Sequence, residues 1–267
     1  MNILIIGTNR IEQEIINLSL KSKYLKHIYT ASSKPLKEIP NIEYNSFNEL
    51  ISKSKALQID IIFVEDKNLI QLGLVEELKK NKLNVISVNK KWFNLENSRI
   101  VAKELMNYYS INNPEIIKAP LTFPIVVKTN TPELTKIAYS MEDLIKIRKI
   151  FSGKPMFLEE FLNGDIYYLL SFWDGKNILY FPINNNLSEV QIERLNIYKT
   201  KMNFMLSDEK ANFIGFFISK LIWAKNNWHV LEYTMRLNKH ANLNSIDKDF
   251  LYLINMALYQ RLNEISS

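Results

Sequence analysis

Apolar, β-prone runs alternate with helix-like segments along the first 90 residues, and this alternation limits the folds open to the chain. The run Asn2–Gly7 is apolar and ends in glycine, and an amphipathic stretch from Ile11 to Leu20 follows it. The buried-type run Ile59–Val64, a helical pattern from Ile70 to Lys80 and a strand at Asn84–Ser87 continue the order. Strands alternating with helices predict an α/β fold with a parallel sheet.

A second pattern begins after Ser110–Pro114, the segment that ends a helix expected from about Asn94 to Tyr109. Short strand-like runs then flank a helix at Met141–Phe151, which is typical of a small α+β lobe. We expect an N-terminal α/β domain over residues 1–93 and a second domain over residues 94–267. The second domain would contain a small lobe at about 118–160 and a larger lobe at about 161–267.

Three features define the expected larger lobe. Asp174-Gly175-Lys176 lies between two strand-like runs and predicts a hairpin turn. A helix is expected from about Glu209 to Leu221. A last amphipathic helix is expected from about Asp247 to Leu262.

The composition is that of a globular chain and excludes several classes of protein. The 267 residues are 47% hydrophobic, enough to bury a substantial core. No apolar run approaches the roughly 20 residues that cross a bilayer, and the N-terminus does not read as a secretion signal, so we expect a cytoplasmic protein with no membrane partner. With 0 cysteines there is no disulfide or thiolate metal site. The net charge of +6 lies on scattered lysines without a binding motif, so no nucleic-acid partner is expected.

The run Met156–Asp165 is the candidate centre of a binding site. Apolar residues lead into Glu159 and Glu160, and the Asn163-Gly164 turn follows. This order predicts a buried strand that ends at a hinge. Backbone groups at such a hinge, with Phe161 and Leu162 as apolar walls, suit the edge of an adenine ring. An ordinary hairpin with its turn at Asn163-Gly164 is the alternative interpretation.

Two other strand-like runs end in charged side chains. Lys128 ends the run Ile125–Lys128 and has the charge to neutralise phosphate. Glu232 and Arg236 follow one another in Leu231–Arg236, where a carboxylate suits magnesium and an arginine suits developing phosphoryl charge. Each residue taken alone is more often a solvated group at the rim of a sheet.

The order and spacing of these segments resemble the ATP-grasp ligases, and most closely the phosphoribosylamine–glycine ligases. Gly73–Leu78 is similar to that family's G-L-V-D-A-F, and Leu95–Met106 is similar to its L-E-G-S-K-x-F-A-K-x-F-M. Other segments fall in the family's order, namely the N-terminal strand, Pro124–Lys128, Leu158–Gly164, Asp174-Gly175, Gly215–Ala224 and Leu231–Arg236. The resemblance extends over nearly the whole chain but matches only the family's N-terminal part. We therefore expect the family's usual C-terminal domain to be absent.

The resemblance implies a fold, a reaction and a set of site residues. The fold would be a Rossmann-like N-terminal domain followed by a two-lobed ATP-grasp domain. ATP would phosphorylate the carboxylate of glycine, and the amine of phosphoribosylamine would attack the acyl phosphate. The residues implied to bind ATP are Arg99, Lys128, Glu159, Glu160, Phe161, Leu162 and Asp165. Glu232 and Thr234 would hold Mg²⁺, and Arg236 would act on the phosphoryl group.

The chain departs from the family mainly at positions that carry chemistry. The family's glycine-rich phosphate lid is here Thr129–Thr135, which has no glycine and contains Pro132. Four further substitutions are Arg99 for a phosphate-binding lysine, Ile166 for a ribose-binding carboxylate with Asp165 beside it, Thr234 for an asparagine, and Glu65-Asp66-Lys67 for G-P-E near the sugar phosphate.

Three hypotheses follow from these departures. The leading one is a diverged family member that binds ATP or another nucleotide weakly and has impaired or lost ligase activity. The second is an active ATP-dependent carboxylate–amine ligase with altered substrates. The third is a non-catalytic subunit or adaptor that binds a protein partner, which a large exposed apolar patch would favour.

Overall fold

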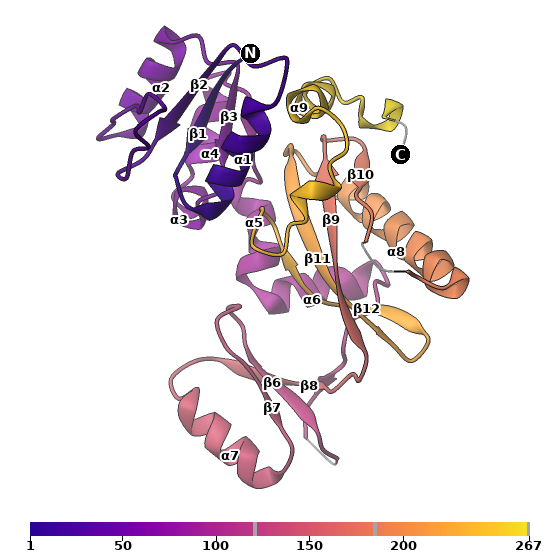
Figure 1. The fold of residues 1–267 in the computed structure, drawn as a ribbon. Helices are drawn as coiled ribbons and strands as arrows, with labels where there is room; N and C mark the ends of the chain where they lie inside the picture. The colour runs from indigo at the N-terminus through magenta and orange to yellow at the C-terminus, as the bar shows by residue number, and fades with distance from the viewer. Residues whose placement is uncertain (120–121, 184–185, 266–267) are drawn as a thin grey trace.

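Three four-stranded sheets organise residues 1–119, 122–183 and 186–265, the part of the chain that the computed structural model describes (Figure 1). The N-terminal sheet has the order β2-β1-β3-β4, the small-lobe sheet β5-β8-β6-β7, and the large-lobe sheet β10-β9-β11-β12. The expected mixed α/β architecture, with a parallel N-terminal sheet followed by two antiparallel lobes, is confirmed.

The N-terminal sheet is parallel throughout. Its strands are β1 (Asn2–Ile6), β2 (His27–Ala31), β3 (Ile61–Val64) and β4 (Val85–Ile86), and its helices are α1 (Arg10–Leu20), α2 (Phe47–Ala56), α3 (Lys67–Gln71) and α4 (Leu74–Lys80). Every residue of β1 and β3 is buried, as expected of parallel strands with both faces covered. This explains why their sequences are uninterrupted apolar runs.

The small lobe is an antiparallel sheet covered by one helix. It comprises β5 (Ile116–Ile117), β6 (Ile125–Thr129), β7 (Thr135–Ala138), α7 (Met141–Ile150) and β8 (Met156–Glu160). Alternate residues of β6 and β8 pack into a core of their own with α7, formed by Ile125, Val127, Ala138, Leu144, Ile147, Phe151 and Leu158. Residues 120–121, near the expected start of this lobe, lie outside the described residues.

The large lobe is built on a second antiparallel sheet. It comprises β9 (Asp165–Trp173), β10 (Ile178–Tyr180), α8 (Glu189–Asp208), β11 (Gly215–Ala224), β12 (Asn227–Thr234) and α9 (Phe250–Leu258), with single 3-10 turns at Leu243–Ser245 and Leu262–Glu264. The predicted hairpin joins β9 to β10, and the Asp174 carboxylate accepts hydrogen bonds from the N–H groups of Lys176 and Asn177. Local turn chemistry therefore fixes this connection.

The prediction of a helix from about Glu209 to Leu221 is wrong. Helix α8 ends at Asp208, and Gly215–Ala224 forms strand β11. This strand is almost wholly buried, so its sequence is a continuous apolar run that periodicity cannot separate from a helix. The last helix, α9, is also shorter than the expected Asp247–Leu262.

Two of the expected helices are each divided in two. The helix expected from about Asn94 to Tyr109 is α5 (Lys90–Asn97) followed by α6 (Arg99–Tyr108). Ser98 separates them in an extended conformation, and its hydroxyl caps α6 by accepting the Val101 N–H. Gly73, with a φ of 85°, similarly separates α3 from α4.

Two hydrophobic cores run through both the N-terminal sheet and the large lobe, because successive residues of each strand face opposite sides. One core contains Leu4, Ile6, Phe217 and Leu221. The other contains Ile3, Ile5, Phe216 and Ile218. A backbone hydrogen bond of 2.7 Å from Ser87 N–H to the Ile214 carbonyl joins the two sheets directly. The N-terminal sheet and the large lobe thus share their packing.

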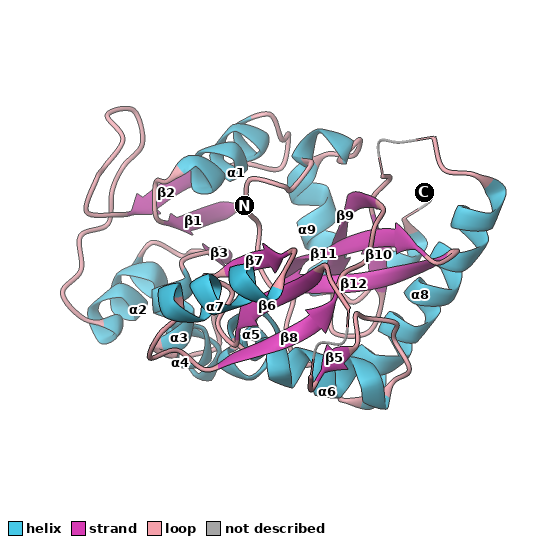
Figure 2. Cartoon of the chain, turned by 90° about the horizontal axis from the view of Figure 1, so that it is seen from below, coloured by secondary structure: helices cyan, strands magenta, loops and turns pink. Residues whose placement is uncertain are grey.

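The small lobe stands apart from the N-terminal sheet. Figure 1 shows it at the foot of the molecule, with α5 and α6 between it and the N-terminal strands. In both views α8 and the N-terminal sheet lie at opposite ends of the large lobe (Figure 2). Among the residues described, no helix is long and apolar enough to span a bilayer.

Candidate functional site

A cavity of about 430 Å³ lies between the small and large lobes, within the size range of small-molecule sites. Strands β6, β7 and β8 contribute one wall, and β9, β11 and β12 contribute the other. Seven of the expected site residues line it, namely Arg99, Lys128, Glu159, Glu160, Phe161, Leu162 and Glu232. We call this cavity the cleft.

The hinge between the lobes requires glycine at position 164. A Cβ atom built on Gly164 would lie 1.9 Å from the carbonyl oxygen of Trp223, far inside van der Waals contact. Leu162 packs next to this point with Ile222, Ala224 and Leu231. The chain therefore passes directly against β11 as it leaves β8, and this places Phe161 and Leu162 at the cleft.

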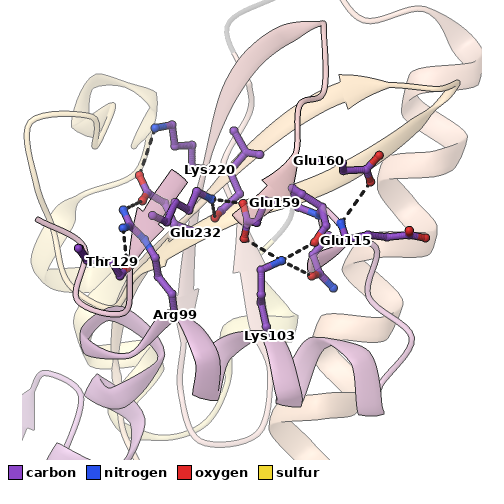
Figure 3. A network of polar contacts seen from close by, with 12 residues as sticks. Arg99, Lys103, Glu115, Thr129, Glu159, Glu160, Lys220 and Glu232 are labelled. Carbon is purple, nitrogen blue, oxygen red and sulfur yellow. Dashed lines mark hydrogen bonds and ion pairs between the residues drawn. The ribbon is translucent and has the colours of Figure 1, made fainter. Parts of the chain in front are cut away.

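Glu159 is a buried carboxylate held between two lysines (Figure 3). Its side chain is 1% exposed, and its oxygens lie 2.8 Å from Lys103 Nζ and 2.6 Å from Lys128 Nζ. Lys128 lies on the cleft face of β6, diagonally opposite Glu159 on β8, and also donates to the Leu231 carbonyl. Burial lowers the pKa of Lys128, and the Glu159 charge opposes that effect.

Glu232 is held in the same way on the opposite wall (Figure 3). Lys220 Nζ lies 3.1 Å from Oε1, and Arg99 Nη2 lies 3.2 Å from Oε2. Lys220 is the direct cross-strand partner of Glu232 in the β11–β12 ladder. Burial would raise the pKa of Glu232, but Lys220 and Arg99 outweigh burial and hold this pKa below its ordinary value.

The loop 129–135 is fastened to the start of α6. Arg99 Nη1 donates to the carbonyls of Thr129, Thr131 and Leu134 at 3.1, 3.2 and 3.0 Å. The Asn130 side-chain oxygen accepts the Ile100 N–H at 3.0 Å, and the Asn130 carbonyl accepts the Arg99 N–H at 2.9 Å. The loop therefore supplies acceptors both to the arginine and to the free N–H groups of the helix N-terminus.

Three of the expected site residues lie outside the cleft lining. Asp165 is exposed and pairs with Trp223 in the β9–β11 ladder, while its neighbour Ile166 faces the cleft. The Thr234 hydroxyl accepts from the Asn238 side chain at 3.4 Å. Arg236 donates through Nε to Glu96 at 3.0 Å, so its guanidinium is engaged by a carboxylate of α5.

The donor set at Glu232 does not fit Mg²⁺. Magnesium requires several oxygen ligands in near-octahedral geometry. Both Glu232 oxygens already face a cationic nitrogen, and an ammonium and a guanidinium at that distance repel a divalent ion. In the part of the chain that is described, no three acidic, histidine or cysteine side chains gather as a metal cluster.

Sequence reasoning did not identify Lys103 and Lys220 as site residues. Lys103 follows Arg99 by four positions, so both side chains leave the same face of α6 (Figure 3). Lys220 is a single charge within the apolar run Gly215–Ala224. An isolated lysine in a buried strand could have identified Lys220 as a site residue. The incorrect prediction of a helix from about Glu209 to Leu221 concealed this pattern.

A second cavity, of about 840 Å³, lies at the carboxyl ends of β1, β2 and β3. Asp66 lines it, but the Asp66 carboxylate accepts the N–H groups of Asn68 and Leu69 and so caps α3. Glu65 is 5% exposed, and its Oε2 accepts the Leu237 N–H at 2.7 Å. The two carboxylates that replace the family's G-P-E therefore have structural partners.

Comparison with known proteins supports the same assignment of fold. No family model matches the sequence. The chain is 27% identical to phosphoribosylamine–glycine ligase of Fusobacterium nucleatum, over 99% of this chain and 75% of that protein. Its fold matches phosphoribosylamine–glycine ligase of Thermotoga maritima with a TM-score of 0.74 at 18% identity, covering 96% of this chain and 75% of that one. It also matches carboxyaminoimidazole ribonucleotide synthase of Aspergillus clavatus complexed with ATP, with a TM-score of 0.66 at 11% identity, covering 90% and 71%.

Proposed function

Because the chain has the fold of the ATP-grasp ligases and resembles phosphoribosylamine–glycine ligase in sequence, we propose that it is a diverged protein of this type. Its cleft would bind an adenine nucleotide weakly, through the hinge at Phe161 and Leu162 and the cations Lys128 and Arg99. Its carboxylate–amine ligase activity would be impaired or lost.

The observation that carries this proposal is that loop 129–135 is hydrogen-bonded to Arg99 and to the N-terminus of α6. The reaction of the relatives, as the resemblance implies it, needs amide N–H groups closed over the phosphates. Here the Thr129 N–H donates to the Leu134 carbonyl, the Asn130 N–H donates to the Pro155 carbonyl, and Pro132 has no N–H. The carbonyls that Arg99 contacts would repel a phosphate rather than bind it.

An activity assay with a binding assay tests the proposal. We expect calorimetric titration with ATP to give weak affinity, and we expect no ADP release that depends on phosphoribosylamine and glycine. An active phosphoribosylamine–glycine ligase assayed in parallel shows that both substrates are intact and that the assay detects ADP release. ADP release that requires both substrates would contradict the proposal.

An active ligase with altered substrates is the second candidate. Arg99, Lys128 and Glu159 remain together in the cleft, which favours it. On this candidate, some pairing of a carboxylate with an amine supports ADP production, and Lys128→Ala and Glu232→Ala each abolish it. ADP production that is unchanged in both variants would exclude it.

A further inference from the structure

The cleft contains two matching arrangements in which one carboxylate lies between two cations. In one, Glu159 lies between Lys103 and Lys128. In the other, Glu232 lies between Arg99 and Lys220, as Figure 3 shows. Of these side chains, only Lys220 and Glu232 are more than about a tenth exposed.

The two arrangements leave positive charge uncompensated. Four cations face two carboxylates, so two positive charges remain, while the nearby pairs Glu160–Lys225 and Glu133–Lys154 are each neutral. Charge without a counterion is unfavourable where solvent is limited, so the cleft favours an anion. Within the described residues, the Nε of the buried Arg99 also has no hydrogen-bond acceptor.

A metal ion bound to Oε1 of Glu232 would lie beside the Lys220 ammonium, which would repel it. The Lys220 ammonium lies 3.1 Å from Oε1, and its side chain lines the cleft on the same face of β11 as Ile222. An ammonium has three N–H donors, and the Glu232 contact uses one. The remaining donors are available to phosphate oxygens.

We propose that the cleft binds the phosphates of an adenine nucleotide without a divalent cation, with the Lys220 ammonium in the place of the metal. Lys220 and Lys128 would contact the phosphate oxygens directly, and Arg99, whose Nη atoms contact Glu232 and loop 129–135, would contribute its charge. The inference rests on the proposed function only in taking an adenine nucleotide as the ligand. It says nothing about ligation, so the two can fail separately.

Calorimetric titration of the full chain with ADP, once in EDTA and once in excess Mg²⁺, tests the proposal. We expect ADP to bind at least as tightly in EDTA, because Mg²⁺ competes with the cleft for the phosphates. Lys220→Met keeps an apolar side chain of similar length, and it should weaken ADP binding in EDTA about tenfold, the effect of one charge-assisted hydrogen bond. Lys220→Arg should retain most of the affinity.

A second variant gives a readout that needs no nucleotide. Lys220→Glu replaces one of the two cations on Glu232 with a carboxylate, so it should bind Mn²⁺ more tightly than wild type, detected as a greater loss of the free Mn²⁺ signal in electron paramagnetic resonance. Wild-type protein should leave that signal unchanged. Lys176→Met, at an exposed position in the β9–β10 hairpin, is the matched control for charge removal. Circular dichroism checks that each variant is folded.

Three results would overturn the inference. They are ADP binding that Mg²⁺ strengthens, ADP binding that Lys220→Met leaves unchanged, and no ADP binding under either condition. In the last case the weak nucleotide binding of the proposed function fails as well, whereas its impaired or lost ligase activity still stands. ADP release that depends on phosphoribosylamine and glycine would instead contradict the impaired-ligase proposal. Whether nucleotide binding requires Mg²⁺ would then still be decided by the ADP titrations.

Discussion

Glu65 lies buried between the N-terminal sheet and the segment that follows β12, where its carboxylate accepts the Leu237 N–H. Burial raises its pKa to about 8, and the nearby Glu12 and Glu96 add to the rise against the opposing effects of Leu237 and Arg236. In the unfolded chain the reference value is 4.5. Between these two values the folded protein holds a proton that the unfolded chain releases, so this group's contribution to stability falls as pH rises from about 5 to 8.

Glu65→Gln should remove that pH dependence. The neutral amide can still accept the Leu237 N–H, so the variant should match wild type near pH 5 and be more stable at pH 8, by a few kcal/mol at most. Urea denaturation at several pH values measures this difference. Glu43→Gln, at an exposed loop position, should keep the wild-type slope. A wild-type slope in Glu65→Gln would show that other groups cause the dependence.

Some individual residues of the cleft could be predicted from the sequence, and others could not. Lys128, Glu159 and Glu232 were expected at the cleft from strand ends and family order, and all three line it. The partners of Glu159 and Glu232 could not be predicted, because Lys103 and Lys220 meet them only after distant elements pack. A sequence motif can identify a site residue, whereas the charged side chains that contact this residue depend on tertiary structure.

At the scale of elements, loop 129–135 and α6 act as one unit through Asn130. Its side-chain oxygen accepts from the Ile100 N–H and the Ser98 hydroxyl, as a capping residue does. Asn130→Ala should lower the free energy of unfolding by about 1 kcal/mol. It should also speed amide hydrogen exchange at Ile100 and through the loop.

Asn130→Asp is the matched control for this prediction. A carboxylate keeps the acceptor and its charge is favourable at a helix N-terminus, so exchange should stay slow. Equal exchange in Asn130→Ala and wild type would mean that Arg99 alone holds the loop.

The hinge between β8 and β9 offers a second test at this scale. Gly164→Ala must displace the Trp223 carbonyl and should cost about 3 kcal/mol or more. Gly153→Ala is the comparison, because Gly153 has open space but a φ of +79°, so only backbone strain of about 1 kcal/mol is expected. Chemical denaturation of both variants measures the difference, and equal costs would argue against a close approach at the hinge.

Elements with local signals were the ones that could be predicted. The hairpin at Asp174-Gly175-Lys176 depends on turn chemistry that its own residues carry. Helix α8 was missed although its buried residues Leu195, Tyr198, Met202 and Met205 follow helical spacing. Exposed apolar residues on the same helix, such as Ile192 and Phe204, obscure that pattern.

At the scale of the whole molecule, the small lobe has its own core and the rest shares two cores. Leu144→Ala in the small-lobe core should cost about 2–5 kcal/mol locally. Hydrogen exchange should then quicken in β6, β7, β8 and α7 and stay unchanged in β1, β3, β9 and β11. Leu4→Ala, in a shared core, should instead loosen both the N-terminal sheet and the large lobe. Uniform loosening by Leu144→Ala would show that the lobe does not unfold separately.

The two cores shared by the N-terminal sheet and the large lobe determine which fragments of the chain can fold. A recombinant fragment that stopped near residue 93 would carry β1 and β3 without the apolar side chains of β9 and β11 that complete their packing. Such a fragment would expose these apolar surfaces to water. Exposed apolar surface promotes aggregation, so we expect the fragment to form inclusion bodies. Anyone dissecting this protein by expression should therefore excise the small lobe and keep the two ends of the chain together.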